Sequence, residues 1–136
     1  EEMKVKNMKH FPFKGYKAMA WCGTIIHREG ASKVNDITIN HETIHLMQAK
    51  MCGSWVKYYW RYFIDWLKGN PLIYPASSAY YTTKYESEAY ANEENMSYCK
   101  NYDGSNLQKY TFKDRKKIYK KVGGTSKDWK VYVKTL

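Results

Sequence analysis

The chain has 136 residues, of which 43% are hydrophobic and 26% are charged, and its formal net charge is +10. This length fits one domain with a core of its own and excludes two, so we treat residues 1–136 as a single domain. The three cysteines are odd in number and form no CxxC pair, which argues against a disulfide framework and favours a reducing compartment.

The predicted elements begin after an irregular N-terminus at 1–15. Aromatic and β-branched residues predict a strand at 16–28. A helix follows from Asp36, because apolar and histidine residues recur at alternating steps of four and three, the spacing of one helix face. These residues are Ile37, His41, Ile44, Gln48 and Met51. Gly53 is expected to end this helix, and Ser54 to cap the next one.

The segment 55–68 predicts a helix that is apolar over most of its circumference. Its charged residues, Lys57, Arg61, Asp65 and Lys68, form one narrow stripe. A helix of this kind is either buried in the core, which is the more ordinary case, or meets a membrane surface or a protein partner. At about 20 Å it could lie on a bilayer but not cross it.

The second half of the chain predicts more helices and one strand. Two prolines make 69–81 a loop, and Thr83 with Glu86 resembles a capping box that opens a helix over 83–101. The inward face of that helix is predicted to hold Tyr85, Ala89, Asn92, Met96 and Cys99, with Glu88 at its edge. A further helix at 111–121 and a short strand in WKVYVKTL are expected to complete the fold.

Residues 100–136 form a basic C-terminal extension with 11 Lys or Arg and three Asp. Such a balance is typical of attraction to nucleic acid or to an anionic membrane. The charge run KDRKKIYKK also fits the solvated face of a surface helix, which we favour. No base-reading or RNA-binding motif accompanies it, so nucleic acid is the least favoured partner.

The motif that predicts chemistry is His41-Glu42-Thr43-Ile44-His45. His41 and His45 lie one helical turn apart, so both imidazoles can bind one metal ion. Glu42 cannot easily bind the same ion, but it can act as general base toward a water molecule that the ion activates. We therefore predict a site for one Zn²⁺ per chain, with Glu42 as the catalytic residue.

A catalytic zinc site needs a third protein ligand and leaves the fourth position for water. His10 and His27 lie upstream in weakly patterned segments, and Glu86 and Glu88 lie downstream on a predicted helix. Because Glu86 is assigned to the capping box, Glu88 is the predicted ligand. Asn92, one turn later, is predicted to hydrogen-bond a ligand histidine from the second shell.

HETIH followed by ESEAYAN resembles the gluzincin arrangement, in which HExxH on one helix is followed by Glu-x-x-x-Asp on another. The resemblance implies a zinc metallopeptidase with His41, His45 and Glu88 as ligands and Glu42 as base. Asn92 occupies the position of the Asp, which is a departure from the pattern.

Three blocks, FPFKGYKAMAWCG, INHETIH and YESEAYANEENM, are also similar to a group of small, uncharacterised bacterial proteins with FPFKG, NHExxH and FExEAYANE blocks. This likeness covers roughly residues 8–100. It implies the same metal-site geometry but no particular substrate.

Together these patterns predict an α+β fold, a minimal zincin-like domain whose N-terminal strands pack on a core of about three to four helices. The favoured function is a zinc-dependent peptidase or related hydrolase that acts on a peptide or protein lying along the edge of strand 16–28. Loop 69–83 would then serve as a lid, with Tyr80 or Tyr81 as oxyanion donors. The alternatives are a noncatalytic zinc-binding or interaction domain, and a basic and aromatic module that binds an anionic membrane or nucleic acid.

The location in the cell stays open. No stretch approaches the ~18 apolar residues of a membrane span, and no signal peptide is visible. A leader or anchor before Glu1 also stays open. The cysteines favour the cytoplasm, and helix 55–68 keeps a membrane-peripheral location in view.

Overall fold

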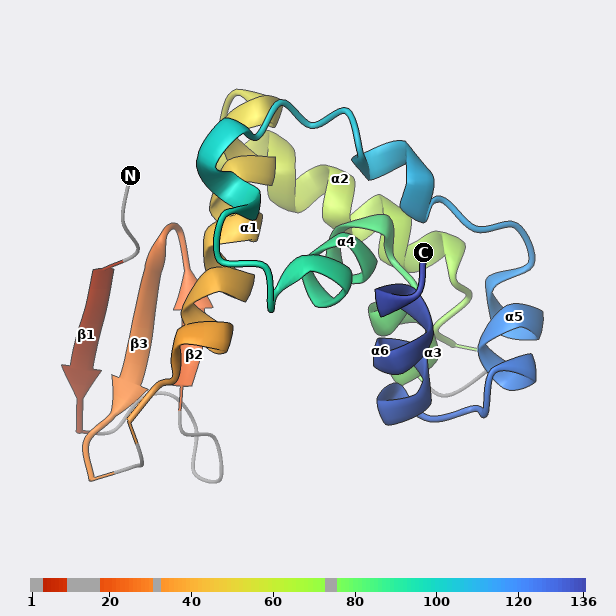
Figure 1. The fold of residues 1–136 in the computed structure, drawn as a ribbon, viewed down its shortest axis with the longest axis horizontal. Coiled ribbons are helices and arrows are strands. Elements are labelled where there is room, and N and C mark those ends of the chain that lie inside the picture. Colours follow the sequence, from red (N-terminus) through yellow and green to blue (C-terminus); the bar gives the residue numbers. More distant parts are fainter. Residues whose placement is uncertain (1–3, 10–17, 31–32, 73–75) are drawn as a thin grey trace.

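The computed structural model describes residues 4–9, 18–30, 33–72 and 76–136. Three strands come first in the chain and helices follow (Figure 1). The strands are β1 (Lys4–Met8), β2 (Ala18–Trp21) and β3 (Thr24–Arg28). The helices are α1 (Asp36–Cys52), α2 (Trp55–Lys68), α3 (Ala76–Tyr81), α4 (Lys84–Asn92), α5 (Arg115–Lys121) and α6 (Ser126–Lys134), with short 3-10 helices η1 (Tyr98–Asn101) and η2 (Leu107–Tyr110). The predicted α+β class with N-terminal strands is confirmed.

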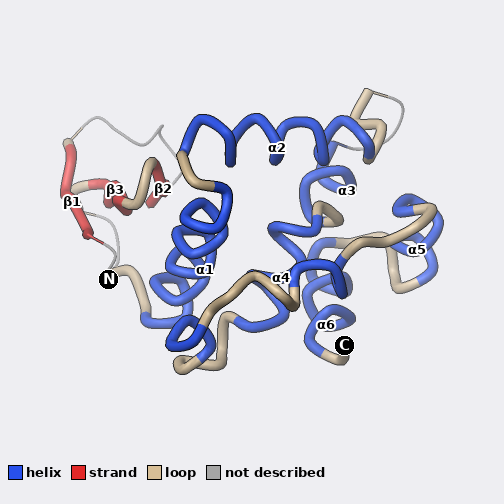
Figure 2. Tube along the Cα trace, turned by 90° about the horizontal axis from the view of Figure 1, so that it is seen from above, coloured by secondary structure: helices blue, strands red, loops and turns tan. Residues whose placement is uncertain are grey.

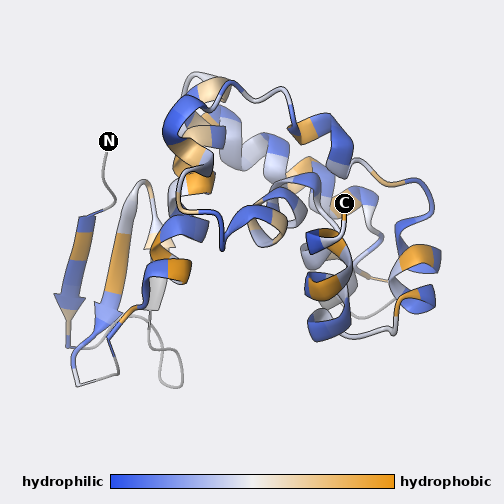
Figure 3. Cartoon of the chain, in the orientation of Figure 1, coloured by the Kyte–Doolittle hydropathy of each residue, from blue (hydrophilic) through white to orange (hydrophobic). Residues whose placement is uncertain are grey.

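The sheet lies at one side of the helical body, next to α1 (Figures 1 and 2). Its strand order is β1-β3-β2, with β1 parallel and β2 antiparallel to β3. The central strand has an apolar middle, orange in Figure 3, and Ile25 on it is buried. Within the described residues β2 pairs only with β3, so its outer edge has no strand partner there.

The predicted strand 16–28 is in fact a hairpin. Cys22 and Gly23 both have positive φ, of 47° and 87°, and they join Trp21 to its partner Thr24 by a two-residue turn. Positive φ at both central residues is the geometry that matches the twist of paired strands. The backbone N–H of Cys22 donates to the Tyr59 hydroxyl of α2 at 3.2 Å, which ties the turn to that helix.

Helix α1 has the predicted bounds. Asn35 caps it by accepting from the Thr38 N–H at 2.8 Å, and Gly53 ends it in the left-handed region with φ 93°. Ser54 then caps α2, as predicted, by accepting from the Lys57 N–H. The buried residues of α1 are Asn40, His41, Ile44, His45, Leu46, Gln48 and Ala49. Four of these are polar, which is unusual for a core-facing helix.

Other predicted elements differ from the structure. The segment WKVYVKTL is helix, not strand, because Thr125 caps α6 and the i, i+4 pair Trp129 and Val133 is fully buried against neighbouring aromatics. A short helix, α3, begins within the predicted loop 69–81. The predicted helix 83–101 ends at Asn92, with a 3-10 turn further on, and the helix predicted at 111–121 begins at Arg115.

The ends of the chain also need correction. Within the predicted irregular N-terminus, Lys4–Met8 form strand β1, whereas the FPFKG block lies outside the described residues. The basic C-terminal extension belongs to the helical body, because α6 packs against α4 through the Trp129 cluster. In the part of the chain that is described, no helix has both the length and the apolar character that crossing a bilayer requires.

Candidate metal centre

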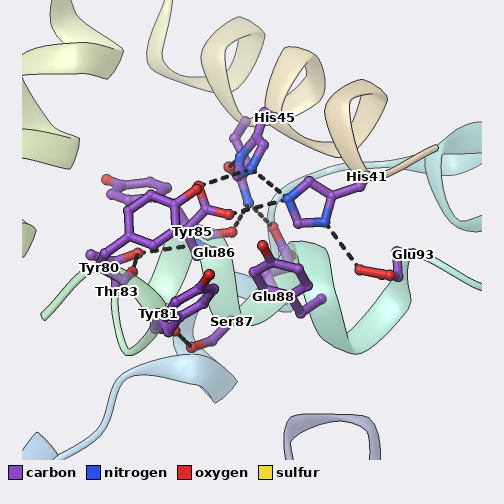
Figure 4. Close-up of polar contacts among 12 residues, drawn as sticks. His41, His45, Tyr80, Tyr81, Thr83, Tyr85, Glu86, Ser87, Glu88 and Glu93 are labelled. Carbon is purple, nitrogen blue, oxygen red and sulfur yellow. Dashed lines mark hydrogen bonds and ion pairs between the residues drawn. The ribbon is translucent and has the colours of Figure 1, made fainter. Parts of the chain in front are cut away.

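Helix α1 directs two histidines toward α4. His41 and His45 are buried, with exposed fractions of 7% and 9%, and their rings meet edge to face with centroids 4.9 Å apart. Their Nε2 atoms are 3.2 Å apart (Figure 4). The sequence prediction that both histidines lie on one buried helix face is therefore confirmed.

Helix α4 supplies the carboxylate that meets them. Glu86 Oε1 lies 3.1 Å from His41 Nε2, and Glu86 Oε2 lies 3.2 Å from His45 Nε2. The ligand atoms of these three residues all lie within 4.8 Å of one another. Thr83 fixes the start of α4 by accepting from the Glu86 N–H at 3.2 Å, and the Tyr62 hydroxyl donates to Glu86 Oε2 at 2.6 Å.

A second layer of contacts orients both imidazoles. His41 Nδ1 lies 3.2 Å from Glu93 Oε1, and His45 Nδ1 lies 2.9 Å from both Gln48 Oε1 and the Tyr58 hydroxyl. The Gln48 amide is oriented in turn, because its Nε2 donates to the Tyr85 carbonyl at 3.0 Å. A carboxylate and an amide oxygen only accept, so each Nδ1 is assigned as the N–H donor. Both Nε2 lone pairs then point at Glu86.

Three acceptors that converge in a buried place can hold a cation between them. Two nitrogen ligands about 2.05 Å from a tetrahedral zinc ion lie about 3.3 Å apart. The 3.2 Å between the two Nε2 atoms and the 3.1–3.2 Å to the Glu86 oxygens match that spacing. The donor set of two imidazoles and one carboxylate is also one that catalytic zinc sites use. The residues present therefore fit a zinc ion.

The electrostatics of the three groups also favour positive charge. Burial lowers the pKa of His41, but its hydrogen bonds to Glu86 and Glu93 outweigh that and raise it to about 10. Burial also lowers the pKa of His45. The negative charge of Glu86 and its hydrogen bond to His45 outweigh burial, so the pKa of His45 is raised. Burial would raise the pKa of Glu86, yet the charges and hydrogen bonds of the two histidines hold it well below its usual range. Without a metal the three groups would hold protons instead.

A cleft of about 330 Å³ adjoins His45 and Glu86. Its lining includes His45, Glu86 and Glu42, together with the β2–β3 turn and the aromatic side of α2. The lining residues are Ala20, Trp21, Cys22, Gly23, Glu42, His45, Trp55, Tyr58, Tyr59, Tyr62, Tyr80 and Glu86. Glu42 is half-buried there, and its carboxylate makes no hydrogen bond or ion pair with any described residue. It is therefore available to accept a proton from a molecule in the cleft.

The structure does not bring the predicted ligand Glu88 to the histidines. Glu88 is fully buried elsewhere on α4, where its carboxylate accepts from Gln48 Nε2 at 2.8 Å and from the hydroxyls of Tyr98 and Tyr102 at 2.9 and 2.6 Å. Among the described residues, Glu86 is the carboxylate that lies within reach of both histidines. A full capping box does not form. The Thr83 hydroxyl accepts from the Glu86 N–H, but the Thr83 N–H donates to the Tyr80 carbonyl, and the Glu86 side chain turns toward α1.

Asn92 also has a different role from the predicted one. Its amide donates to the Glu88 carbonyl at 2.9 Å and to the Tyr110 hydroxyl at 3.1 Å. The carboxylate that orients a histidine is that of the next residue, Glu93. Gln48 and Tyr58 do the same for His45 and were not predicted as site residues, although a glutamine on the inward face of α1 was a signal of a buried polar contact.

The other residues that the sequence offered for the site are the two tyrosines Tyr80 and Tyr81 and the two upstream histidines. Tyr80 lines the cleft, whereas Tyr81 packs against Tyr90, and the Lys130 ammonium of α6 lies over both of these rings. His27 lies on β3, where its Nδ1 is 3.0 Å from Asn7 Oδ1, and His10 lies outside the described residues. Of the two predicted oxyanion donors, Tyr80 lines the cleft and Tyr81 does not.

Comparison with known proteins finds no matching family model, no matching curated protein and no matching solved structure. The interpretation of the site therefore depends on its own geometry.

Proposed function

We propose that the protein is a zinc-dependent hydrolase, a peptidase or an enzyme of related chemistry, with His41, His45 and Glu86 as ligands of one Zn²⁺ ion. The observation that supports this most directly is the convergence of three buried lone-pair-bearing groups beside an open cleft. An arrangement that served only structure would have no need of the cleft, because structural zinc sites are closed by a fourth protein ligand.

Glu42 is the proposed general base. A bound zinc ion would supply Lewis acidity, which polarises a carbonyl and makes water acidic enough to lose a proton near neutral pH. The Glu42 carboxylate takes that proton as the water oxygen bonds to the carbonyl carbon. It then delivers the proton to the leaving nitrogen as the carbon–nitrogen bond breaks. Its position next to His41 on a rigid helix keeps it beside the ligands but outside the ligand set.

The cleft supports an extended, uncharged peptide as substrate. Ala20 and Trp21 of β2 line it, and the outer edge of β2 has no strand partner within the described residues. An extended chain could pair with that edge and pass over the ligands. The lining residues include six aromatic side chains and no Lys or Arg, which disfavours an anionic group and suits an apolar one.

Tyr80 is the proposed donor to the developing oxyanion. Burial raises the pKa of its phenol, and the nearby Glu86 charge adds to that rise. The hydroxyl therefore keeps its proton at neutral pH and can donate a hydrogen bond to negative charge in the cleft.

The test uses the zinc-loaded chain and a library of quenched fluorescent peptides. Glu42→Gln should retain one zinc per chain and lose turnover by about 10²–10⁴-fold, because only the base is removed. Glu94→Gln, on the exposed side of the same region as Glu93, is the matched control and should cleave like the wild type.

Two results would contradict the proposal. Cleavage by Glu42→Gln at the wild-type rate would exclude Glu42 as base. A zinc-loaded wild type that left every peptide in the library intact would favour the noncatalytic zinc-binding domain.

A further inference from the structure

Helix α2 carries a row of large apolar side chains that the described part of the chain leaves exposed. The row follows i, i+4, i+7 and i+11 spacing, so it forms one straight stripe along the helix. Its members are Val56, Trp60, Phe63 and Leu67, with exposed fractions of 81%, 63%, 45% and 41%. Leu72, just beyond the helix, is 92% exposed. We call these five residues the α2 face. Single exposed apolar residues are ordinary, but a contiguous patch marks a surface that meets something apolar.

Three cations flank this face, against one exposed acid, Asp103, which lines the same hollow as Trp60 and Arg61. Lys57, Arg61 and Lys68 are all exposed and lie along one margin of the stripe. The single acid of α2, Asp65, has its carboxylate 3.5 Å from the Arg115 guanidinium and accepts from the Lys84 N–H. The charge that the face presents is therefore positive, as is that of the whole chain at +10.

We propose that the α2 face docks on the surface of an anionic lipid bilayer. A basic amphipathic helix with Trp, Phe and Leu on its apolar side has the composition of helices that lie in the membrane interface. Trp is favoured at headgroup depth, and lysines beside it are attracted to anionic lipids. Figure 3 colours much of α2 pale because Trp and Tyr have intermediate hydropathy, and that amphipathic character suits an interface better than a hydrocarbon core.

The position of the face relative to the cleft follows from the same helix. Trp55, Tyr59 and Tyr62 of α2 line the cleft, and Trp21, which is 60% exposed, stacks on Tyr59 with ring centroids 5.3 Å apart. Docking through α2 thus brings the mouth of the cleft close to the bilayer. The docking itself does not depend on the metal centre or on any activity.

The experiment measures binding of the full chain to sedimented vesicles. One set of vesicles is phosphatidylcholine with about 30% phosphatidylglycerol, which gives the vesicle surface a strong negative potential. The other set is pure phosphatidylcholine. Binding should require phosphatidylglycerol and should weaken steeply between low and high salt. Trp60→Ser/Phe63→Ser should abolish it. The matched control Met96→Ser/Val131→Ser, two exposed apolar residues away from α2, should leave it unchanged.

Lysine substitutions at two places distinguish attraction of the vesicles to the α2 face from attraction to the net charge of the whole chain. Lys57→Gln/Lys68→Gln should weaken binding by roughly fivefold per lysine removed. Lys121→Gln/Lys127→Gln removes the same net charge from α5 and α6, and Figure 2 places α6 on the opposite side of the molecule from α2. That control should bind nearly as the wild type.

Three results would overturn the proposal. The first is the absence of binding to anionic vesicles at low salt. The second is an equal loss of binding in both lysine pairs, which would make the attraction nonspecific. The third is a stable dimer in sedimentation velocity that Trp60→Ser/Phe63→Ser dissolves, because a second copy would then cover the face.

Discussion

The seam between α1 and α4 and the outer face of α2 depart in opposite ways from the rule that apolar groups are buried and polar groups exposed. The seam buries His41, His45, Glu86 and Glu88, and no buried polar side-chain atom of the described residues lacks a hydrogen-bond partner. The α2 face exposes Trp60 and its neighbours, which none of the residues that the structure describes buries. In the first region the buried polar groups bind one another, and three of them lie close enough together to hold a metal ion. The second region exposes apolar side chains that could contact another molecule, so the two regions need different experiments.

The largest effect expected at the seam comes from removing one of the three proposed ligands. His45→Ala should lower zinc affinity by more than about 100-fold, beyond the 10–100-fold typical of changes outside the ligand set. Competition with a chromogenic chelator measures this. His27→Ala, on β3, should bind zinc as the wild type does. Equal affinity in the two variants would break the account of the seam.

A smaller loss is expected from the residue that orients His41. Glu93→Gln replaces the carboxylate that accepts from His41 Nδ1, so zinc affinity should fall by about 10–100-fold while binding persists. Glu94→Gln changes the adjacent exposed carboxylate and should have no effect. If the two variants lost the same affinity, the second layer of the site would be wrongly assigned.

Glu88 is expected to affect the stability of the fold rather than zinc binding. Its carboxylate accepts hydrogen bonds from Gln48, Tyr98 and Tyr102, so Glu88→Gln places an amide N–H₂ where donors already point. We expect the free energy of unfolding of the metal-free chain to fall by about 1–3 kcal/mol in urea titrations. No loss beyond about 0.5 kcal/mol, the range of neutral surface changes, would contradict the view that Glu88 holds this part of the seam together.

The smallest effect is expected on the α2 face. Trp60 is 63% exposed, so Trp60→Ser should change the free energy of unfolding by no more than about 0.5 kcal/mol. A loss of several kcal/mol, as in truncation of a core aromatic, would show that the face is buried in the folded chain in solution. That result would remove the contrast between the two regions.

The sequence predicted the α1 helix, its C-terminal cap and the inward direction of His41 and His45, because helical spacing and capping residues are local signals. It could not decide between Glu86 and Glu88. Residues two apart on a helix point about 200° from each other, and which of them meets α1 depends on how α4 docks. The contact between α1 and α4 joins residues more than 40 positions apart, and no local pattern encodes it.

A different error arose at the C-terminus, where the prediction for WKVYVKTL was a short strand. In the same segment Trp129 and Val133 are four residues apart, which also fits a helix. The cap at Thr125 and burial against Phe112 and Tyr119 favour the helix, and burial of this kind is tertiary information. The exposure of α2 was open for the same reason, since its sequence fits both core and interface.

The most direct test of the metal centre is the zinc content of Glu86→Gln beside Glu88→Gln, two near-isosteric changes at buried carboxylates of one helix. Each is purified without added metal, checked for native circular dichroism and measured by inductively coupled plasma mass spectrometry. The account predicts about one zinc per chain in the wild type and in Glu88→Gln, and loss of zinc in Glu86→Gln. Zinc retained in Glu86→Gln and lost in Glu88→Gln, or a wild type that takes up no zinc, would contradict it. In the second case His41, His45 and Glu86 would be a buried cluster that shares protons.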